Sequence, residues 1–243
     1  MGPKYIRREL SAVIEEAYRY FSVITVTGPR QSGKTTMIRN LFPHLPYYSL
    51  ENLDVRSFAE NDPVAFLNQH AEGMILDEVH NAPNLLSYIQ GMVDDDADRR
   101  FILSGSSQFA MLKRITQSLA GRTAVFELLP LSYSEIREIA SDTPLDHLLL
   151  DGFYPAIYSG RNVPKFLYPA YMKTYLDKDV RDLLQIKDMM QFHTFIRLCA
   201  GRIGSLFKAS ELANEIGISS HTITAWLSVL QASYIVALLP PYF

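Results

Sequence analysis

The stretch Gly28-Pro29-Arg30-Gln31-Ser32-Gly33-Lys34-Thr35 decides the fold of this 243-residue chain. It matches the pattern G-x-x-x-x-G-K-[ST], in which glycines let the backbone curl until successive N–H groups converge on one anion. The start of the following helix adds unpaired donors and a partial positive charge. The pattern therefore predicts a phosphate-binding loop; the alternative is a glycine-rich turn that binds nothing.

The residues on either side of the loop suit a strand-loop-helix unit. Val23-Ile24-Thr25-Val26 is a β-branched run typical of a strand, and residues 36–42 can continue as a helix until Pro43. In such a unit Lys34 reaches the β- and γ-phosphates of ATP, and the Thr35 hydroxyl binds Mg²⁺. The predicted nucleotide-binding residues are Gly28, Pro29, Arg30, Gln31, Ser32, Gly33, Lys34, Thr35 and Thr36.

The second signal is Met74-Ile75-Leu76-Asp77-Glu78, a short apolar run that ends in two carboxylates. A buried parallel strand reads as continuous apolar residues, and its carboxyl end lies beside the phosphate loop. Asp77 is then predicted to hold Mg²⁺, and Glu78 to act as general base toward the attacking water. The alternative is a solvated acidic pair at the end of a strand.

Two further segments contribute candidate residues. Phe101-Ile102-Leu103-Ser104 predicts a strand between the two strands already described, and Ser104 or Ser106 would face the γ-phosphate; ordinary turn chemistry explains them also. Arg122 precedes a last strand at 125–128, where its guanidinium could contact a phosphate within its own chain or across a subunit contact of a homo-oligomer. A surface ion pair is the alternative for Arg122.

The rest of the pattern is helical. Residues from about 5 to 18 have helical spacing, Ser132-Tyr133-Ser134-Glu135 is a capping box, and 165–186 reads as one long helix. Near the end, Ser210 and Ser219 or Ser220 are predicted helix caps on either side of a turn at Gly217, as in a helix-turn-helix. Residues 234–239 read as the first strand of a wing.

The would-be recognition helix of that motif offers Ser, His and Thr side chains but no Lys or Arg. Because neutralisation of phosphates carries most DNA affinity, this composition weakens the case for DNA binding. The predicted organisation is thus a three-layer α/β P-loop core with a five-stranded parallel sheet (1–130), a helical segment (131–200) and a partial winged helix-turn-helix (201–243).

Composition sets the class of protein. Hydrophobic residues make up 48% and charged residues 20%, and the formal net charge of −3 gives no overall attraction to nucleic acid or acidic membranes. One cysteine permits no intrachain disulfide, and the six histidines are scattered, which disfavours a zinc site. The lone cysteine fits a reducing cytosol, so we expect a cytoplasmic protein. No apolar run is long enough for a membrane span, so we expect no membrane partner.

Several motifs together resemble one family. They are Gly-Pro-Arg-Gln-Ser-Gly-Lys-Thr-Thr (28–36), Leu-Asp-Glu-Val (76–79), Leu-Ser-Gly-Ser-Ser (103–107), Ser-Leu-Ala-Gly-Arg (118–122), Leu-Pro-Leu-Ser (129–132), Gly-Phe-Tyr-Pro (152–155), Tyr-Leu-Asp-Lys-Asp-Val (175–180) and Pro-Pro-Tyr-Phe (240–243). The set is similar to a widespread prokaryotic family of AAA+-like P-loop ATPases, whose core is followed by a winged helix and a C-terminal domain of unknown function. The resemblance implies ATP and Mg²⁺ binding, slow hydrolysis, and Arg122 as a phosphate sensor.

The chain departs from that family at two places. His80 stands where many relatives have Gln, which argues against a γ-phosphate-sensing side chain there. The chain also ends at Phe243, in the predicted wing, whereas relatives continue with a further domain; this suggests a truncated or shortened product. An ATPase is the leading hypothesis. An ATP-gated switch that binds DNA or protein through the helix-turn-helix is the alternative, and a small-molecule kinase is disfavoured by Asp77-Glu78.

Overall fold

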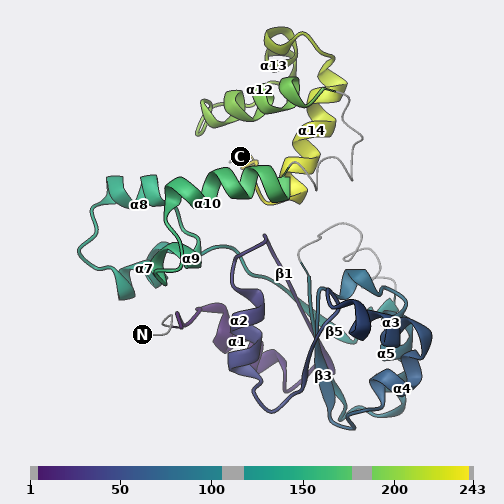
Figure 1. The fold of residues 1–243 in the computed structure, drawn as a ribbon. Coiled ribbons are helices and arrows are strands. Elements are labelled where there is room, and N and C mark those ends of the chain that lie inside the picture. Colours follow the sequence, from purple (N-terminus) through teal and green to yellow (C-terminus); the bar gives the residue numbers. More distant parts are fainter. Residues whose placement is uncertain (1–4, 106–117, 177–187, 241–243) are drawn as a thin grey trace. The chain divides into compact units, whose positions relative to one another are not determined.

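The computed structural model describes residues 5–105, 118–176 and 188–240. It divides into two compact units, Met1–Leu167 (unit 1) and Tyr168–Phe243 (unit 2), drawn in Figure 1. The segment predicted as helical, 131–200, is therefore shared between the two units. Among the described residues, no helix is long and apolar enough to cross a membrane.

Unit 1 is built on one five-stranded sheet whose order is β2-β3-β4-β1-β5. The strands are β1 (Val23–Thr27), β2 (Tyr47–Ser49), β3 (Gly73–Asp77), β4 (Arg100–Ser104) and β5 (Thr123–Glu127). All pairs are parallel, with Ile24 opposite Ile102 on β4 and Ala124 on β5. The predicted parallel sheet is confirmed, and so is the position of β4 between β1 and β3.

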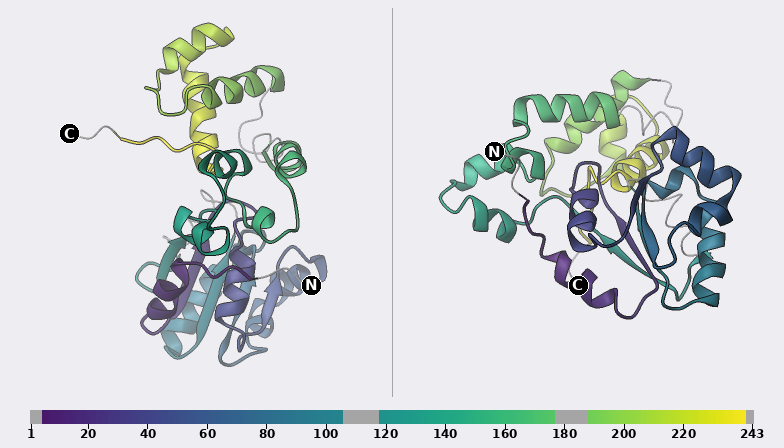
Figure 2. Two further views of the ribbon diagram at one scale, coloured as in Figure 1. Left: turned by 90° about the vertical axis from the view of Figure 1, so that its left-hand side faces the viewer. Right: turned by 60° about the horizontal axis from the view of Figure 1, so that its bottom comes forward.

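Helices cover both faces of this sheet, as Figures 1 and 2 show. On one face α1 (Leu10–Ala17) and α2 (Lys34–Leu41) pack against Ile24, Val26 and Ile102. The other face is covered by α3 (Leu53–Asn61), α4 (Pro63–Leu67) and α5 (Leu85–Asp95). Because successive strand side chains point to opposite faces, the continuous apolar runs of β1, β3 and β4 supply both cores. The three layers are those that the sequence predicts.

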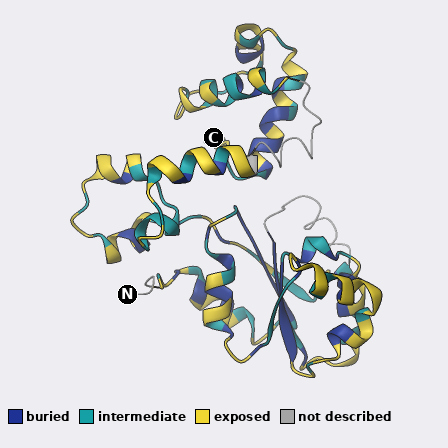
Figure 3. Ribbon diagram, in the orientation of Figure 1, coloured by how far each residue is buried: buried dark blue, intermediate teal, exposed yellow. Residues whose placement is uncertain are grey.

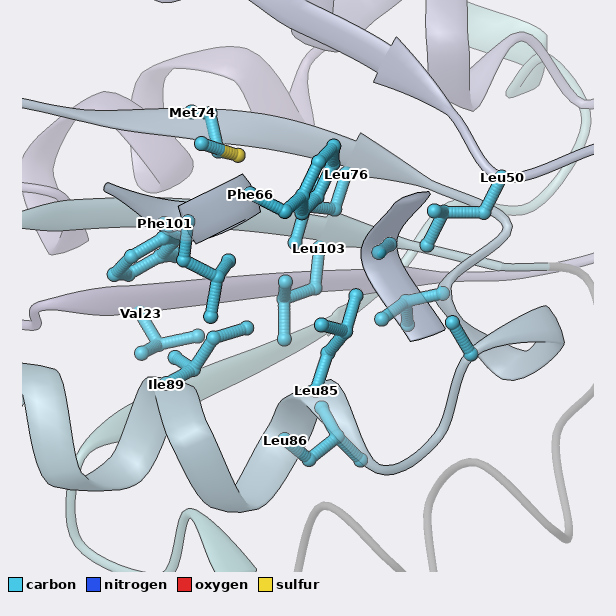
Figure 4. Packing of buried hydrophobic residues seen from close by; sticks show 14 of the residues in the cluster. Val23, Leu50, Phe66, Met74, Leu76, Leu85, Leu86, Ile89, Phe101 and Leu103 are labelled. Carbon is cyan, nitrogen blue, oxygen red and sulfur yellow. The ribbon is translucent and has the colours of Figure 1, made fainter. Parts of the chain in front are cut away.

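The core beneath α5 is shown in Figure 4. Leu85, Leu86 and Ile89 on α5 meet side chains of the strands, including Phe101 and Leu103 of β4. These residues are at most 2% exposed. A buried Leu or Phe contributes roughly 1.5–3 kcal/mol relative to its exposed state. Burial of these side chains therefore stabilises the sheet, and its buried strands are among the dark blue segments in Figure 3.

The first helix begins later than the sequence predicts. Its spacing suggested a helix from about residue 5, but α1 starts at Leu10. The backbone N–H of Glu9 instead donates to the Glu135 carboxylate, and the Arg8 side chain binds the same group. These long-range contacts involve the residues just before α1, and residues 5–8 form no regular element, which local spacing does not indicate.

After β5 the chain becomes helical, and its helices continue past Leu167, the last residue of unit 1. The elements are α7 (Tyr133–Ile139), α8 (Leu145–Asp151), α9 (Pro155–Tyr158), α10 (Pro164–Tyr171) and a π-helical turn η2 (Met172–Leu176). The capping box at the start of α7 is confirmed, since Ser132 and Glu135 each bond the other's backbone N–H. The predicted helix over 165–186 is confirmed over residues 165–176, as α10 followed without a break by the π-helical turn η2; residues 177–187 lie outside the described chain.

Unit 2 is a small helical core. It contains α12 (Met189–Ala200), α13 (Ala209–Ile216) and α14 (Ser220–Ala232), with Trp226 packed edge-on against Phe192 at 5.3 Å between ring centroids. Gly217 at φ 79° turns the chain from α13 to α14, and the Ser219 side chain caps α14 through Thr222 N–H, as predicted. Ser210 is not a cap, because α13 already begins at Ala209.

The predicted wing strand does not form. Residues 234–239 are in neither helix nor strand, and Tyr234 has a φ of 60°. A strand needs a hydrogen-bonded partner, and none exists in unit 2 over residues 188–240. The apolar run Ile235–Leu239 is a local signal only, and Ile235 and Val236 instead pack onto the helical core.

Candidate functional site

The phosphate loop joins β1 to α2 at the carboxyl edge of the sheet. Gly28 has a φ of 141°, and a Cβ there would lie 2.2 Å from the carbonyl oxygen of Leu128. Gly33 has a φ of 95° and stands immediately before α2. Both conformations favour glycine because it has no side chain to clash. The two glycines of the motif therefore have separate roles, close approach at Gly28 and a left-handed turn at Gly33.

Lys34 folds back over this loop. Its Nζ donates to the carbonyl oxygens of Gly28 and Pro29, both at 2.9 Å, and the residue is 6% exposed. Burial lowers the pKa of Lys34 to about 8, against the opposing influence of the Glu78 and Asp77 charges, which raise it. The ammonium group is thus held within the loop, and a bound polyanion would favour its charged form.

Asp77 ends β3 and is the centre of a polar cluster. Its Oδ2 accepts from Thr35 Oγ1 at 2.8 Å and from the Tyr47 hydroxyl at 2.7 Å, while Oδ1 accepts from Ser104. Asp77 is 6% exposed and Ser104 is fully buried. The structure thus brings together Thr35, Asp77 and Ser104, three residues that the sequence placed in one site from three different strands and loops.

Tyr47 is a member of this cluster that sequence reasoning missed. Burial and its bond to Asp77 raise the pKa of the Tyr47 hydroxyl above its ordinary value, so the hydroxyl stays protonated and donates. The guanidinium carbon of Arg39 lies 4.7 Å from the centroid of the Tyr47 ring. Tyr47 sits opposite Ile75 in the β2–β3 register, so only the pairing of the strands brings it to Asp77.

Glu78 follows Asp77 in a left-handed conformation, with φ 54° and ψ 46°. Non-glycine residues in this region are uncommon and often occur at functional sites. The Glu78 carboxylate is 16% exposed, and its Oε2 lies 3.1 Å from Nδ1 of His80. The extended backbone of β3 therefore ends at Asp77, and the charge of Glu78 raises the pKa of Lys34.

The oxygen donors of this cluster suit a hard cation. Mg²⁺ is bound in nucleotide sites through one or two protein oxygens, waters and the phosphates rather than by a full protein cage. Thr35 Oγ1 and the Asp77 carboxylate are such donors, in hydrogen-bond contact at the edge of the loop. Within the described residues no group of three or more His, Cys, Asp or Glu side chains gathers to hold a metal alone. The residues present therefore fit Mg²⁺ that arrives with a nucleotide.

Comparison with known proteins agrees with this geometry. Residues 20–137 match the family model described as "AAA domain", and residues 142–243 match a domain of unknown function (DUF8612). Residues 20–137 are thus similar to an AAA domain. The resemblance to AAA-type P-loop ATPases is thereby confirmed. The second match spans most of the segment predicted as helical (131–200) and all of the segment predicted as a winged helix (201–243).

Relatives of the whole chain are themselves uncharacterized proteins. One from Mycobacterium tuberculosis is 30% identical over 246 residues, covering 98% of this chain and 54% of that protein. One from Methanocaldococcus jannaschii is 22% identical over 247 residues, covering 88% and 55%. This chain therefore spans about half the length of these curated relatives. The fold is similar to that of a Walker-type ATPase of Pyrococcus abyssi, with a TM-score of 0.62, 14% identity, and coverage of 94% of this chain and 90% of that one.

The other residues predicted for the site lie in different surroundings. Pro29 is buried in the loop, Arg30 is partly exposed, and Gln31 and Thr36 are exposed. Gln31 has a φ of 62°, a left-handed conformation within the curl. Ser106 lies outside the described residues. The fold places residues 28–36 in one loop and the start of one helix. That these residues contact a nucleotide stays a prediction.

Arg122 is the predicted site residue that the fold does not bring to the loop. Its carbonyl accepts from Val23 N–H, at the start of β1, whereas the phosphate loop follows the end of that strand at Thr27. Its guanidinium binds Asp94, with Nε 2.5 Å from Oδ1 and Nη2 2.8 Å from Oδ2. A five-residue strand spans roughly 15 Å or more. The prediction that Arg122 acts within its own chain is not supported; a role across a subunit contact stays a prediction.

Proposed function

We propose that this protein binds ATP with Mg²⁺ at residues 28–36 and hydrolyses it to ADP and phosphate. The convergence of Lys34, Thr35, Asp77 and Glu78 at one edge of the AAA domain supports this proposal most directly. A glycine turn that binds nothing would not need a buried lysine and a buried aspartate within reach of each other, because burying charges is costly.

Each of these residues has a distinct part in the proposed reaction. Loop N–H groups and Lys34 bind the β- and γ-phosphates, and Thr35 with Asp77 holds the cation. Mg²⁺, when bound, neutralises charge that develops on the phosphates. Glu78 accepts a proton from water as the water oxygen bonds to the γ-phosphorus, and the bond from that phosphorus to the bridging oxygen breaks to release ADP.

Phosphate release by the purified protein tests this proposal. We expect Lys34→Ala to lose nucleotide binding and to lower turnover about 100-fold or more, because a preorganised charge at the phosphates is removed. Glu78→Gln should keep ATP binding and lower turnover about 100-fold or more through loss of the base. Matched controls are Lys165→Ala, an exposed lysine on α10, and Glu72→Gln, an exposed acid just before the other end of β3.

Equal phosphate release by the wild type, Lys34→Ala and Glu78→Gln would disprove hydrolysis at this site. Retained ATP binding by all three would disprove the binding site as well. If Glu72→Gln lowered turnover as much as Glu78→Gln, the effect would come from the loss of any negative charge, and Glu78 would not be a positioned base. Thermal unfolding of each variant separates loss of function from loss of fold.

A second candidate function is an ATP-gated switch that engages DNA or protein through unit 2. The observation that favours it is the helix-turn-helix itself, with Gly217 in the turn and the Ser219 cap on α14. Against DNA stands the absence of Lys and Arg from α14. Adding duplex DNA to the same turnover assay, at two salt concentrations, tests it. ATP-dependent, salt-sensitive binding supports the switch, and absence of binding excludes DNA as its ligand.

A further inference from the structure

Arg8 is a buried side chain with four hydrogen bonds that the proposed chemistry does not use. It lies two residues before α1, and it is 6% exposed. Its Nη1 donates to the carbonyl oxygen of Ser32 at 2.8 Å, in the middle of the phosphate loop. Its Nη2 donates to the carbonyl oxygens of Leu129 at 2.8 Å and Pro130 at 3.0 Å. One guanidinium thus connects the N-terminal segment, the loop and the chain after β5.

The contact with Ser32 bears on the direction of a phosphate-binding donor. In a planar trans peptide the carbonyl of one residue and the N–H of the next point in opposite directions. The described residues contain no cis peptide bond, so the Ser32 carbonyl and the Gly33 N–H are opposed in this way. Arg8 Nη1 would lie 3.9 Å from a Cβ built on Gly33. When Ser32 presents its oxygen to Arg8, the Gly33 N–H points away from Arg8.

Glu135 holds Arg8 in this place. Its Oε1 accepts from Arg8 Nε at 3.0 Å and from Glu9 N–H at 2.7 Å, and its Oε2 accepts from Ser132 N–H at 2.8 Å. Burial raises the pKa of the Glu135 carboxyl, but the bonds from Arg8 and the two backbone groups outweigh it and hold the pKa below its usual value. The carboxylate is therefore ionised and compensates the buried charge of Arg8.

The shape of the guanidinium explains why an arginine occupies this position. Four acceptors lie around its edge: the carbonyl oxygens of Ser32, Leu129 and Pro130 and a carboxylate oxygen of Glu135. A planar fork with five N–H donors can serve all of them at once, whereas a lysine has a single nitrogen with three donors. The arrangement orients the Ser32 carbonyl rather than merely neutralising a charge.

We propose that Arg8 is a positioning residue of the phosphate loop. It turns the Ser32 carbonyl outward and thereby turns the Gly33 N–H toward the bound phosphates. This inference rests on the proposed nucleotide site at residues 28–36, but it concerns the orientation of one peptide rather than the chemistry. Its loss should weaken ATP binding, while the rate at saturating ATP changes little because Asp77 and Glu78 are held by other contacts.

The test compares Arg8→Lys and Arg8→Ala with Arg7→Ala, which removes the neighbouring exposed arginine. Calorimetric titration with ATP and Mg²⁺ should give about tenfold weaker binding for Arg8→Lys, the size expected when a hydrogen bond involving a charged group is lost. KM should rise in parallel and kcat should stay within about twofold. Added guanidinium ion at millimolar concentration should partly restore ATP affinity to Arg8→Ala. Arg7→Ala should bind as the wild type does.

A second measurement reads the loop directly, without turnover. In protein labelled with ¹⁵N-glycine, Arg8→Lys should shift the Gly33 amide resonance and reduce its response to ATP, while Gly91 on α5 stays unchanged. A folded Arg8→Lys variant with wild-type ATP affinity and an unshifted Gly33 would overturn the inference. Failure of both Arg8 variants to fold would overturn it too, since Arg8 would then serve folding. Absence of ATP binding by the wild type would instead overturn the proposed function.

Discussion

The two edges of the parallel sheet in unit 1 carry the same kinds of charged side chain in opposite surroundings. At the carboxyl edge, Lys34 and Asp77 are each 6% exposed. At the amino edge, the side chains of Arg122 and Asp94 are 33% and 45% exposed. Each pair joins an arginine or lysine with an aspartate, but only Lys34 and Asp77 are buried.

Burial of charged side chains distinguishes a candidate functional site from an ordinary surface. A buried charge loses its hydration and persists only when bonds or a ligand compensate it, so a buried cluster indicates a selected arrangement. An exposed ion pair is screened by solvent and salt and contributes little. The group around Lys34 and Asp77 therefore has the properties of a site, and the Arg122–Asp94 pair those of a surface ion pair. Three predictions test how far this contrast extends.

The largest expected effect is on the pH dependence of ATP binding. Lys34 has a pKa of about 8 in the free protein, and bound phosphates should raise it. Below pH 8 the lysine is charged with or without ATP, so affinity is flat. Above pH 8 binding must take up a proton, and affinity should fall about tenfold between pH 8 and pH 9.5. Titrations in buffers of different ionisation enthalpy would measure the proton uptake; a flat profile to pH 9.5 would contradict the assignment.

An intermediate effect is expected from removing one hydroxyl at the carboxyl edge. Tyr47→Phe deletes a bond to Asp77 but leaves those from Thr35 and Ser104, so the Mg²⁺ concentration needed for half-maximal ATP binding should rise about fivefold. Tyr48→Phe is the matched control, because the Tyr48 hydroxyl lies 2.8 Å from His70 and does not contact Asp77. Identical Mg²⁺ dependence in the two variants would exclude a role for Tyr47 in holding Asp77.

The smallest effect is expected at the amino edge. Arg122→Ala removes an exposed pair with Asp94, so turnover should stay within about twofold and the melting temperature should change little. Turnover should be measured over a range of protein concentrations, so that any oligomer formed at high concentration is also tested. A loss of turnover of 1000-fold or more would place Arg122 across a subunit contact, as an arginine supplied in trans does, and would break the contrast between the edges.

Much of the carboxyl edge is predictable because its signals are local. The spacing of Gly28, Gly33 and Lys34 is dictated by one curl of backbone, and Asp77 follows directly from the apolar run of its strand. Ser104 follows in the same way from β4. Local signals also predict the capping box at Ser132 and the turn at Gly217, since each involves residues within a few positions of one another.

Other features depend on which distant segments meet. Arg8 and Glu135 are 127 positions apart, and Tyr47 and Asp77 are 30 apart. No spacing in the chain indicates either contact. The apolar run after Tyr234 shows the converse: it has the composition of a strand, but a strand also needs a neighbour, and none is described in unit 2.

By itself, then, the sequence determined the phosphate loop, the strand that carries Asp77 and the layered α/β core, because each follows from short-range sterics and burial periodicity. Tertiary structure alone decided that Tyr47 joins Asp77, that Arg8 and Glu135 brace the loop, and that Arg122 lies at the opposite edge. The register of the parallel strands places Tyr47 beside Asp77 and Arg122 at the opposite edge. The contact of the N-terminal segment with α7 brings Arg8 to Glu135.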